Sequence, residues 1–302
     1  MCPLEHQTGL MLEGGGMRCA YTAGVLDLFM DKNIDFPFVA TASAGALIGS
    51  SYIAKQRDRN YKILKELGKN PESISFKRMF QKRELFNMEY IFDKVPNEIV
   101  PLDFDAFNES KSDFIIGTTN IETGKPVYYD TFDEKNDLFT VIRASCSLPV
   151  LSPSVTFDHI ELMDGGVSNP IPIQPLMDRG MKKHVVILTR NRGYTKKATK
   201  LNWLYKRLFK EKPALQKLLH DRHLLYNQTM HQLREMEMRN ELFIIQPDEP
   251  LIASRIEKNH QKLEQLYMQG YLEAEKKLED LEIFLSTTDK PPASYIEENV
   301  PS

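Results

Sequence analysis

Short apolar runs alternate with amphipathic segments through the first part of the chain. Apolar residues fill 8–12, which ends in a glycine turn, and 36–42, which ends in a turn of small residues. Each run precedes a segment with apolar residues near helical spacing, at 17–30 and at 43–55. Short apolar runs between turns predict buried strands, and their alternation with helices predicts a parallel sheet. The chain therefore begins as an α/β domain.

The later pattern extends this sheet. We expect further strands at 113–117, 126–129, 160–163, 184–189 and 242–245. The charged, mixed sequence at 57–106 predicts helices and loops that cover the sheet, and 139–145 predicts another helix.

A shift in composition near Arg190 divides the chain. Before it we place the α/β domain, at 1–190. After it the sequence at 191–285 is basic and mostly helical, and we expect it to pack on or beside that domain. The last segment, 286–302, has three prolines and little apolar content, which predicts a flexible tail.

Composition and charge exclude several classes of protein. Of the 302 residues, 41% are hydrophobic and 27% charged, as in ordinary globular proteins. No apolar run approaches the ~20 residues that span a bilayer, and the N-terminus lacks the regions of a secretory signal. The three cysteines form no CxxC pair, so we expect no disulfide framework, no metal site and a cytoplasmic location. A net charge of -3 gives no reason to expect nucleic acid as a partner.

Ser43 is the first candidate for chemistry. It lies in Thr41-Ala42-Ser43-Ala44-Gly45, between a predicted strand and a predicted helix. A sharp turn of small residues at this point exposes a serine hydroxyl above the sheet, close to the positive end of the helix dipole. The usual pattern of such an elbow is Gly-x-Ser-x-Gly, and Thr41 replaces its first glycine. The same residues are also typical of a plain helix N-cap.

Three consecutive glycines, Gly14, Gly15 and Gly16, lie between the first predicted strand and helix. Their N–H groups can bind an anion, either a phosphate or the oxyanion of a tetrahedral acyl intermediate. A dinucleotide fingerprint would need glycine at Cys19, and a P-loop would need Gly-Lys-Ser/Thr, so the oxyanion hole is the preferred anion site. A turn needed only for close packing is the alternative.

Asp164 is the third candidate, because it ends a predicted strand and precedes Gly165 and Gly166. A turn of this kind can deliver the carboxylate to a neighbouring loop, although an Asp-Gly turn can also serve local hydrogen bonding alone. The elbow, the glycine loop and Asp164 all lie at predicted strand ends of one sheet, where α/β proteins bind substrates. We therefore expect them to form one site.

These motifs resemble those of the patatin-like phospholipase family, namely an acidic-Gly-Gly-Gly-x-Arg loop, a Gly-x-Ser-x-Gly elbow and an Asp-Gly-Gly/Ala turn. The blocks at 144–149 and 164–172 also look like that family, and the similarity covers 8–189. The C-terminal part looks like the bacterial YjjU-type branch. The resemblance implies a three-layer α/β/α fold with a mostly parallel central sheet and a helical C-terminal extension.

The resemblance also implies a serine acyl-ester hydrolase, such as a phospholipase A, a lysophospholipase or another lipid acyl hydrolase. Ser43 would be the nucleophile and Asp164 its base, the three glycines would hold the oxyanion, Arg18 would brace their loop, and Gly45 would complete the elbow. An aspartate with an ordinary pKa near ~3.9 is a weak base, so desolvation and the oxyanion hole would contribute much of the catalysis. No cofactor is implied, and the partner would be a lipid or another acyl ester.

Two alternatives stay open. A catalytically inactive relative would bind a lipid or acyl group, since Thr41 and Cys19 depart from the family pattern and could distort the elbow or narrow the site. A Ser-His-Asp esterase would use a histidine that follows the acid. The available histidines are His184, His220, His223 and His231. None of them is predicted in a turn after a strand, so we expect structural or surface roles for them.

The segment 196–212 interleaves basic residues with leucine and aromatic residues. A helix of this composition can lie on an anionic membrane surface, which would make the protein peripheral to the membrane. A helix packed over the sheet with a solvated basic face is the preferred interpretation. The sequence carries no signal for an oligomeric state.

Overall fold

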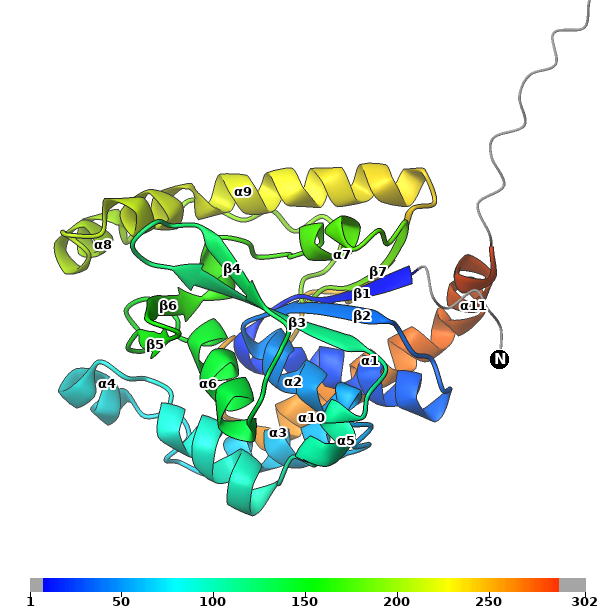
Figure 1. Cartoon of the computed structure of the whole chain (residues 1–302), viewed down its shortest axis with the longest axis horizontal. Helices are drawn as coiled ribbons and strands as arrows, with labels where there is room; N and C mark the ends of the chain where they lie inside the picture. Colours follow the sequence, from blue (N-terminus) through cyan, green and yellow to red (C-terminus); the bar gives the residue numbers. More distant parts are fainter. Residues whose placement is uncertain (1–7, 288–302) are drawn as a thin grey trace, which may run out of the picture.

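An eight-stranded mixed sheet runs through the centre of the protein in the computed structural model, which describes residues 8–287 (Figure 1). The strands are β1 Thr8–Leu12, β2 Phe38–Ala42, β3 Asp113–Asn120, β4 Pro126–Tyr129, β5 Val155–Phe157, β6 Ile160–Asp164, β7 Lys183–Ile187 and β8 Leu242–Ile245. The spatial order is β5-β6-β3-β2-β1-β7-β8, and β4 also pairs with β3. Strands β3, β2, β1, β7 and β8 are parallel, whereas β4 and β6 pair antiparallel with β3, and β5 with β6.

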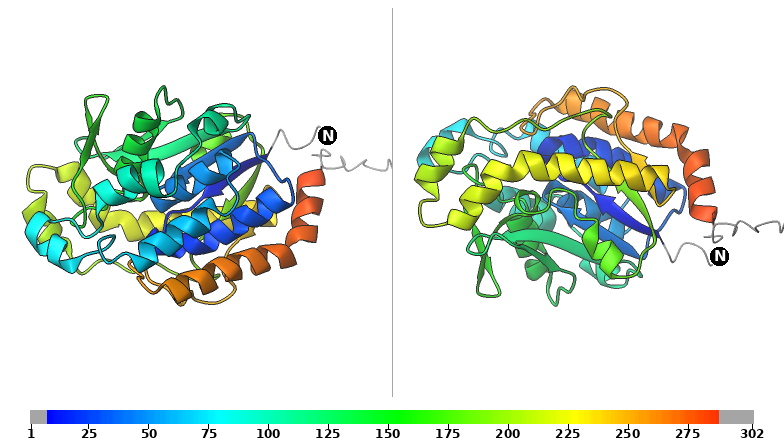
Figure 2. Two further views of the ribbon diagram at one scale, coloured as in Figure 1. Left: turned by 90° about the horizontal axis from the view of Figure 1, so that it is seen from below. Right: turned by 90° about the horizontal axis from the view of Figure 1, so that it is seen from above.

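Helices cover both faces of this sheet (Figures 1 and 2). One face carries α1 Ala20–Asp31, α2 Ala44–Ile53, α3 Arg59–Lys69, α6 Lys135–Ser145 and α10 His260–Lys276, and the other carries α7 Gln174–Asp178 and the long α9 Pro213–Met238. The shorter elements are α4 Phe76–Lys82, α5 Phe104–Asn108, α8 Asn202–Leu208, α11 Leu278–Ser286, the 3-10 helices η2 Gly16–Cys19 and η4 Gly165–Val167, and the π-helix η3 Tyr90–Ile99. The predicted α/β/α layers and the mostly parallel sheet are confirmed.

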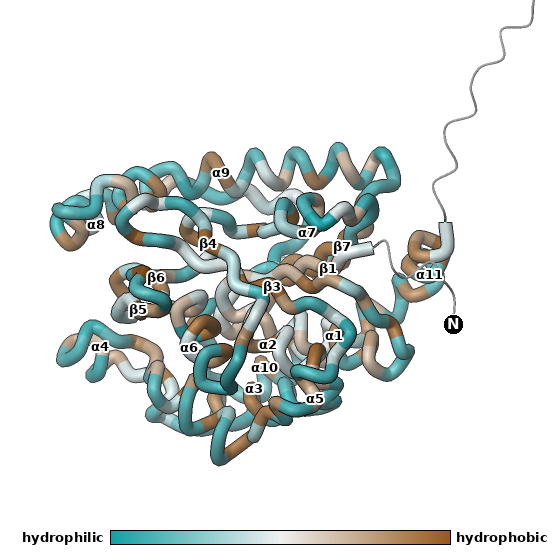
Figure 3. Tube along the Cα trace, viewed as in Figure 1, coloured by the Kyte–Doolittle hydropathy of each residue, from teal (hydrophilic) through white to brown (hydrophobic). Residues whose placement is uncertain are grey.

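The central strands are buried on both faces, so their side chains belong to two hydrophobic cores, one on each side of the sheet. In β1, Leu10 and Leu12 point into the larger core beneath α1 and α2, while Met11 points into the core beneath α7 and α9. Strand β7 repeats this alternation. Successive side chains of a strand point to opposite faces, and parallel strands covered on both sides read as continuous apolar runs. Figure 3 shows this apolar centre between the more polar outer helices.

The predicted strands are all present, and one short strand was not expected. Strand β5 has only three residues and pairs with β6 across a two-residue connection. So short a strand has no extended apolar run from which it could be predicted. The predicted tail at 286–302 lies almost entirely outside the described residues. Residue Ser286 itself ends α11.

The chain after Arg190 contributes to the sheet and to both helical layers. Strand β8 adds an edge beside β7, α9 lies on one face, and α10 packs along α1 on the other. In the basic segment, Tyr205 and Phe209 pack against a small apolar cluster while Trp203 on α8 is 64% exposed. The segment is thus packed on one side, and a membrane contact through its exposed side stays a prediction. Within 8–287, no helix has both the length and the apolar character needed to span a bilayer.

Helices α1 and α10 meet through two glycines. A Cβ atom on Gly24 would lie 1.9 Å from the carbonyl oxygen of Tyr267, and one on Gly270 would lie 2.0 Å from that of Tyr21. Only residues without a side chain permit this separation. The contact also brings Tyr267 Oη to within 2.6 Å of Oδ2 of the buried Asp27, to which it donates a hydrogen bond. The contact therefore anchors the C-terminal region to the first helix.

We expect Gly270→Ala to lower the free energy of unfolding by about 1–3 kcal/mol, because the methyl group forces the two backbones apart. Helix propensity alone predicts the opposite sign, since alanine is favoured over glycine by about 1 kcal/mol in a helix. The matched control is Gln265→Ala on the exposed side of α10, which should change stability by less than about 0.5 kcal/mol. Urea unfolding of both variants checks this, and a stabilised Gly270→Ala would contradict the close contact.

Candidate active site

Ser43 occupies a strained turn between β2 and α2. Its backbone angles are φ 56° and ψ -137°, a region that costs a non-glycine residue about 1–3 kcal/mol and is found mainly at functional sites. The Ser43 N–H donates to Ser145 Oγ at 2.8 Å, and Ser145 Oγ donates to the carbonyl of Gly117 at 2.6 Å. A Cβ on Gly45 would come within 2.8 Å of the Leu12 carbonyl, so the helix start lies directly on β1. These contacts hold the predicted elbow.

The two departures from the family pattern are accommodated. Thr41 is fully buried, and its Oγ1 donates to the carbonyl of Ile115 on the neighbouring strand at 3.0 Å. The thiol of Cys19 donates to the carbonyl of Glu13 at 3.6 Å. Burial raises the pKa of this thiol to about 12, so it stays protonated. The sharp turn at Ser43 therefore forms with threonine in place of glycine.

The glycine loop packs against the elbow. A Cβ on Gly14 would lie 2.5 Å from Ser43 Cβ, and one on Gly15 would lie 2.7 Å from Thr189 Oγ1. Gly16 has φ +59°, and a Cβ there would lie 2.6 Å from the Arg255 carbonyl. Within the described residues, the N–H groups of these three glycines donate no hydrogen bond to the protein. They are therefore free to bind a substrate oxygen beside Ser43.

Two buried side chains hold this loop through Thr189, which follows β7. Glu13 Oε2 accepts hydrogen bonds from Thr189 N at 2.7 Å and from Thr189 Oγ1 at 3.0 Å. Arg18 donates from Nε to the Thr189 carbonyl at 3.3 Å. Burial and the neighbouring Arg190 and Arg255 lower the pKa of Arg18 to about 10, so it remains charged at neutral pH. This arrangement supports the bracing role expected for Arg18.

Asp164 ends β6 and is almost completely buried, at 1% exposure. Its Oδ1 accepts a hydrogen bond from Gly166 N at 2.9 Å, and Arg222 Nη2 lies 3.9 Å from the same oxygen. Its Oδ2 is buried and has no hydrogen-bond partner among the described residues. A buried carboxylate oxygen without a partner is costly and is typical of a functional position. Asp164 thus has one oxygen held in place and one available.

The block at 144–149 links the elbow to the Asp turn. Ser145 binds the Ser43 N–H, as described above, and the Ser147 carbonyl accepts a hydrogen bond from Asp164 N at 2.9 Å. Leu148 lines the cavities around Ser43. This short segment at the end of α6 therefore positions both residues of the predicted dyad, which explains its resemblance to the family block.

Ser43 and Asp164 line the same cavity. The glycine loop forms one wall, and the segment after Arg190 forms another. The residues contributed by that later segment are Lys196, Arg222, Tyr226 and Arg255. Sequence reasoning did not associate Arg222, Tyr226 or Arg255 with the site and assigned Lys196 to a surface helix. They belong to no motif and come from α9 and two loops, so only the folded structure brings them to Ser43.

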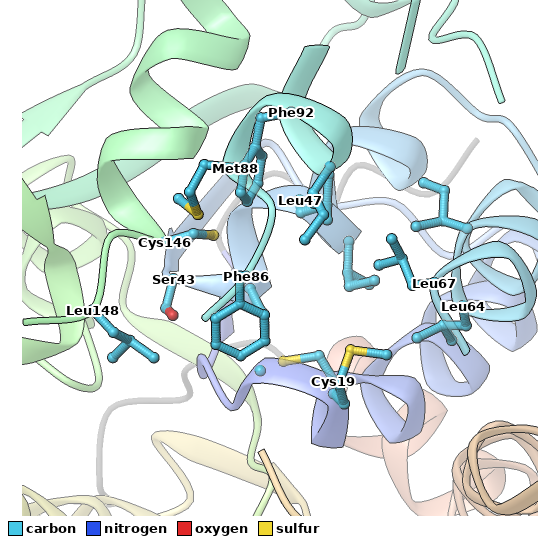
Figure 4. A pocket seen from close by; sticks show the side chains of 16 residues that line it. Cys19, Ser43, Leu47, Leu64, Leu67, Phe86, Met88, Phe92, Cys146 and Leu148 are labelled. Atoms are coloured by element: carbon cyan, nitrogen blue, oxygen red, sulfur yellow. The ribbon is translucent and has the colours of Figure 1, made fainter. Parts of the chain in front are cut away.

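A second, apolar pocket opens beside Ser43 on the other side. Figure 4 shows Ser43 at its edge and Leu64 and Leu67 at its far side. The lining side chains between them are Cys19, Leu47, Phe86, Met88, Phe92 and Cys146. The segment 57–106, expected to cover the sheet, thus also builds one side of this pocket, and residues of η2, α2 and the end of α6 build the rest. The apolar lining suits a hydrocarbon chain.

No histidine lines either cavity in the described part of the chain. His184 is buried within β7, and burial lowers its pKa to about 4, so it is neutral. His220, His223 and His231 lie on α9 outside both cavities. Between residues 8 and 287, no cluster of three or more His, Cys, Asp or Glu side chains could hold a metal ion. The geometry gives no support to a Ser-His-Asp arrangement at Ser43.

Comparisons with known proteins agree with this geometry. A patatin-like phospholipase family model matches residues 10–177, and a domain of unknown function, DUF6363, matches residues 212–286. The uncharacterized protein YjjU of Escherichia coli (strain K12) is 31% identical over 186 residues, which cover 60% of this chain and 51% of YjjU. An uncharacterized NTE family protein of Mycobacterium bovis is 24% identical over 170 residues, which cover 56% of this chain and 45% of that protein. The chain thus matches about half the length of these relatives.

More distant matches extend the comparison. Lysophospholipase NTE1 of Candida albicans is 27% identical over 193 residues, which cover 60% of this chain and 13% of that protein. Among solved structures, VipD from Legionella pneumophila covers 91% of this chain and 67% of its own at 12% identity, with a TM-score of 0.45. The patatin-like match at 10–177 spans more than half of the 302 residues and includes the glycine loop, the elbow and the Asp turn. The chain therefore belongs to the patatin-like phospholipase family.

Proposed function

We propose that this protein hydrolyses lipid acyl esters with a Ser43–Asp164 dyad. The observation that carries the proposal is that one cavity holds both a serine in a strained turn and a buried carboxylate oxygen that has no hydrogen-bond partner in the described part of the chain. The proposal goes beyond the family assignment, since it names the nucleophile, the base and the class of bond. The lysophospholipase name of the fungal relatives is consistent with it.

The reaction uses groups that already surround Ser43. Ser43 Oγ attacks the ester carbonyl carbon, and its proton passes to Asp164 Oδ2. The oxyanion forms beside the N–H groups of the glycine loop. Preorganised donors of this kind stabilise the negative charge of the oxyanion. The tetrahedral intermediate expels the alcohol, which takes the proton from Asp164 and leaves an acyl-enzyme. Water then repeats the sequence and releases the fatty acid.

The apolar pocket beside Ser43 accounts for the acyl side of the substrate. A buried methylene group contributes about 0.8 kcal/mol to binding, so an apolar pocket that runs from Ser43 to Leu64 and Leu67 favours an acyl chain that fills it over a shorter one. Ser43 at the pocket edge is the position at which the carbonyl of such a chain would lie. The preferred substrates are therefore esters of long-chain fatty acids.

We expect Ser43→Ala to abolish labelling by a fluorophosphonate probe and to lower turnover of a nitrophenyl ester by at least about 10³-fold. Asp164→Asn should lower turnover by a similar factor, because the available oxygen or its charge is lost. Ser50→Ala is the matched control, since Ser50 lies on the same helix and bonds only to its own turn at the Leu47 carbonyl. It should label and turn over as the wild type does.

The outcomes separate this proposal from the alternatives. A folded wild type that neither labels nor turns over ester would favour a lipid-binding protein without catalysis. Turnover that survives in Ser43→Ala would place the nucleophile elsewhere.

Filling the far side of the apolar pocket should shorten the preferred acyl chain. The quantity to compare is kcat/KM for a dodecanoyl ester divided by kcat/KM for a butanoyl ester. We expect Leu67→Trp to lower this ratio by about tenfold or more, because the larger side chain removes the space of two or more methylene groups. The volume-conserving Leu67→Met should keep the wild-type ratio. An unchanged ratio in a folded Leu67→Trp would exclude this pocket as the acyl site.

A further inference from the structure

The cavity around Ser43 and Asp164 carries a cluster of three basic side chains that the proposed hydrolysis does not use. Lys196 comes from the loop after β7, Arg222 from α9, and Arg255 from the loop before α10. All three belong to the chain after Arg190. They face the glycine loop, whereas the apolar pocket opens on the other side of Ser43. The site therefore has an apolar end and a cationic end with the nucleophile between them.

Arg222 is held inside the protein with unused donors. Its Nη2 lies 3.9 Å from Asp164 Oδ1, which is too long for a hydrogen bond, and its buried Nε has no hydrogen-bond partner within residues 8–287. Burial lowers the pKa of this guanidinium, and the Asp164 charge opposes that effect only in part. A guanidinium is a donor that matches phosphate and carboxylate geometry. Arg222 is thus available for an anion in the cavity.

Lys196 and Arg255 also lack an acidic partner. Among the described residues, the ion pair of this cavity joins Arg222 to Asp164, and no carboxylate lies within 4 Å of the charged group of Lys196 or Arg255. Lys196 is nevertheless fixed, because Asn227 bonds its backbone N–H at 2.8 Å and its carbonyl at 3.0 Å, and its Nζ lies 4.8 Å from the Tyr226 ring centre.

The charges around this cluster do not balance. Burial, Arg222 and Arg255 lower the pKa of Lys196 to about 6, against the opposing effect of Glu13 and Asp164. Glu13 is already bonded to Thr189. With a pKa of about 6, Lys196 is largely neutral at pH 7 while the cavity is empty. The charges that remain are those of Arg255 and of Arg222, which has only Asp164 nearby, at 3.9 Å. A bound anion would accept charge-assisted hydrogen bonds from both guanidinium groups and would favour the protonated form of Lys196.

An open groove leads from solvent to this cluster. Lys196 and Arg255 line it together with Arg18, Arg190 and Lys197, and no acidic residue is part of its lining. A groove with one sign of charge draws oppositely charged ligands towards its end. The polar part of an anionic lipid could therefore occupy the groove while its acyl chain enters the apolar pocket.

We propose that Lys196, Arg222 and Arg255 form a subsite for a phosphate group of the substrate, so that the preferred substrates are acyl esters of glycerol phosphate rather than neutral glycerides. The inference rests on the proposed function, because it places the phosphate relative to the ester that Ser43 attacks. It assigns the region matched by DUF6363 a part in substrate recognition, through Arg222 and Arg255.

The test compares two substrates that differ only in the phosphate, 1-oleoyl-glycerol and 1-oleoyl-glycerol 3-phosphate. We expect wild type to favour the phosphate ester in kcat/KM by at least about tenfold, and Arg255→Gln and Lys196→Gln each to reduce that preference about tenfold, as loss of a charge-assisted contact predicts. Lys217→Gln is the control, because it removes the same charge from the exposed face of α9. It should keep the preference. Equal use of both substrates by wild type would overturn the subsite.

A binding measurement separates failure of the subsite from failure of the hydrolase. Titration calorimetry of glycerol 3-phosphate and of inorganic phosphate into Ser43→Ala needs no catalysis. We expect both anions to bind, and the added Arg255→Gln substitution to weaken binding by about tenfold or more. Binding of neither anion, or binding unaffected by Arg255→Gln, would refute the subsite even if the ester hydrolysis is established. Binding of inorganic phosphate alone would show an anion site that does not serve the lipid headgroup, and would also refute it.

Discussion

The left-handed backbone at Ser43 is the constraint on which the site depends. A φ of 56° is unfavourable for serine, and the surrounding protein must compensate for a cost of about 1–3 kcal/mol. Ser145 does so through a chain of two hydrogen bonds that joins the elbow to Gly117 on β3. Gly14 and Gly45 contribute by their lack of side chains, since any Cβ there would collide with the elbow or with β1. The strand ends are therefore packed around one serine hydroxyl at the edge of the two cavities.

The same packing gives the two halves of the site opposite character. On one side the helices of the segment 57–106 enclose an apolar pocket, and on the other the chain after Arg190 brings basic side chains to the glycine loop. Ser43 lies where the two meet. An amphiphilic ester matches both halves at once, because its chain and its polar group leave the scissile carbonyl in opposite directions. The arrangement thus links the proposed chemistry to the proposed substrate class.

The sequence alone predicted the parts of this site that rest on local patterns. The glycine loop and Ser43 follow the parallel strands β1 and β2, whose carboxyl ends meet at one edge of the sheet, so their proximity could be anticipated. Asp164 reaches the same edge for a different reason: it ends β6, which is antiparallel to β3 and pairs with it only at residues 118–120, at the carboxyl end of β3. The short apolar runs between turns likewise predicted the central strands. Arg222 and Arg255 could not be found in this way, since neither belongs to a motif and each reaches the site only through tertiary packing. The antiparallel β5 escaped prediction because three residues carry too little pattern.

The contact between the glycine loop and the loop before α10 bears on how such proteins can diverge. Met17 N donates to the Arg255 carbonyl at 3.1 Å, and Gly16 leaves no room for a side chain against that same carbonyl. The glycine loop and the C-terminal region therefore share a boundary of backbone atoms, which any side chain introduced at Gly16 would disturb. Recombination that exchanged the C-terminal region between relatives would have to preserve this main-chain match. The two regions therefore share one structural boundary, although separate family models describe them.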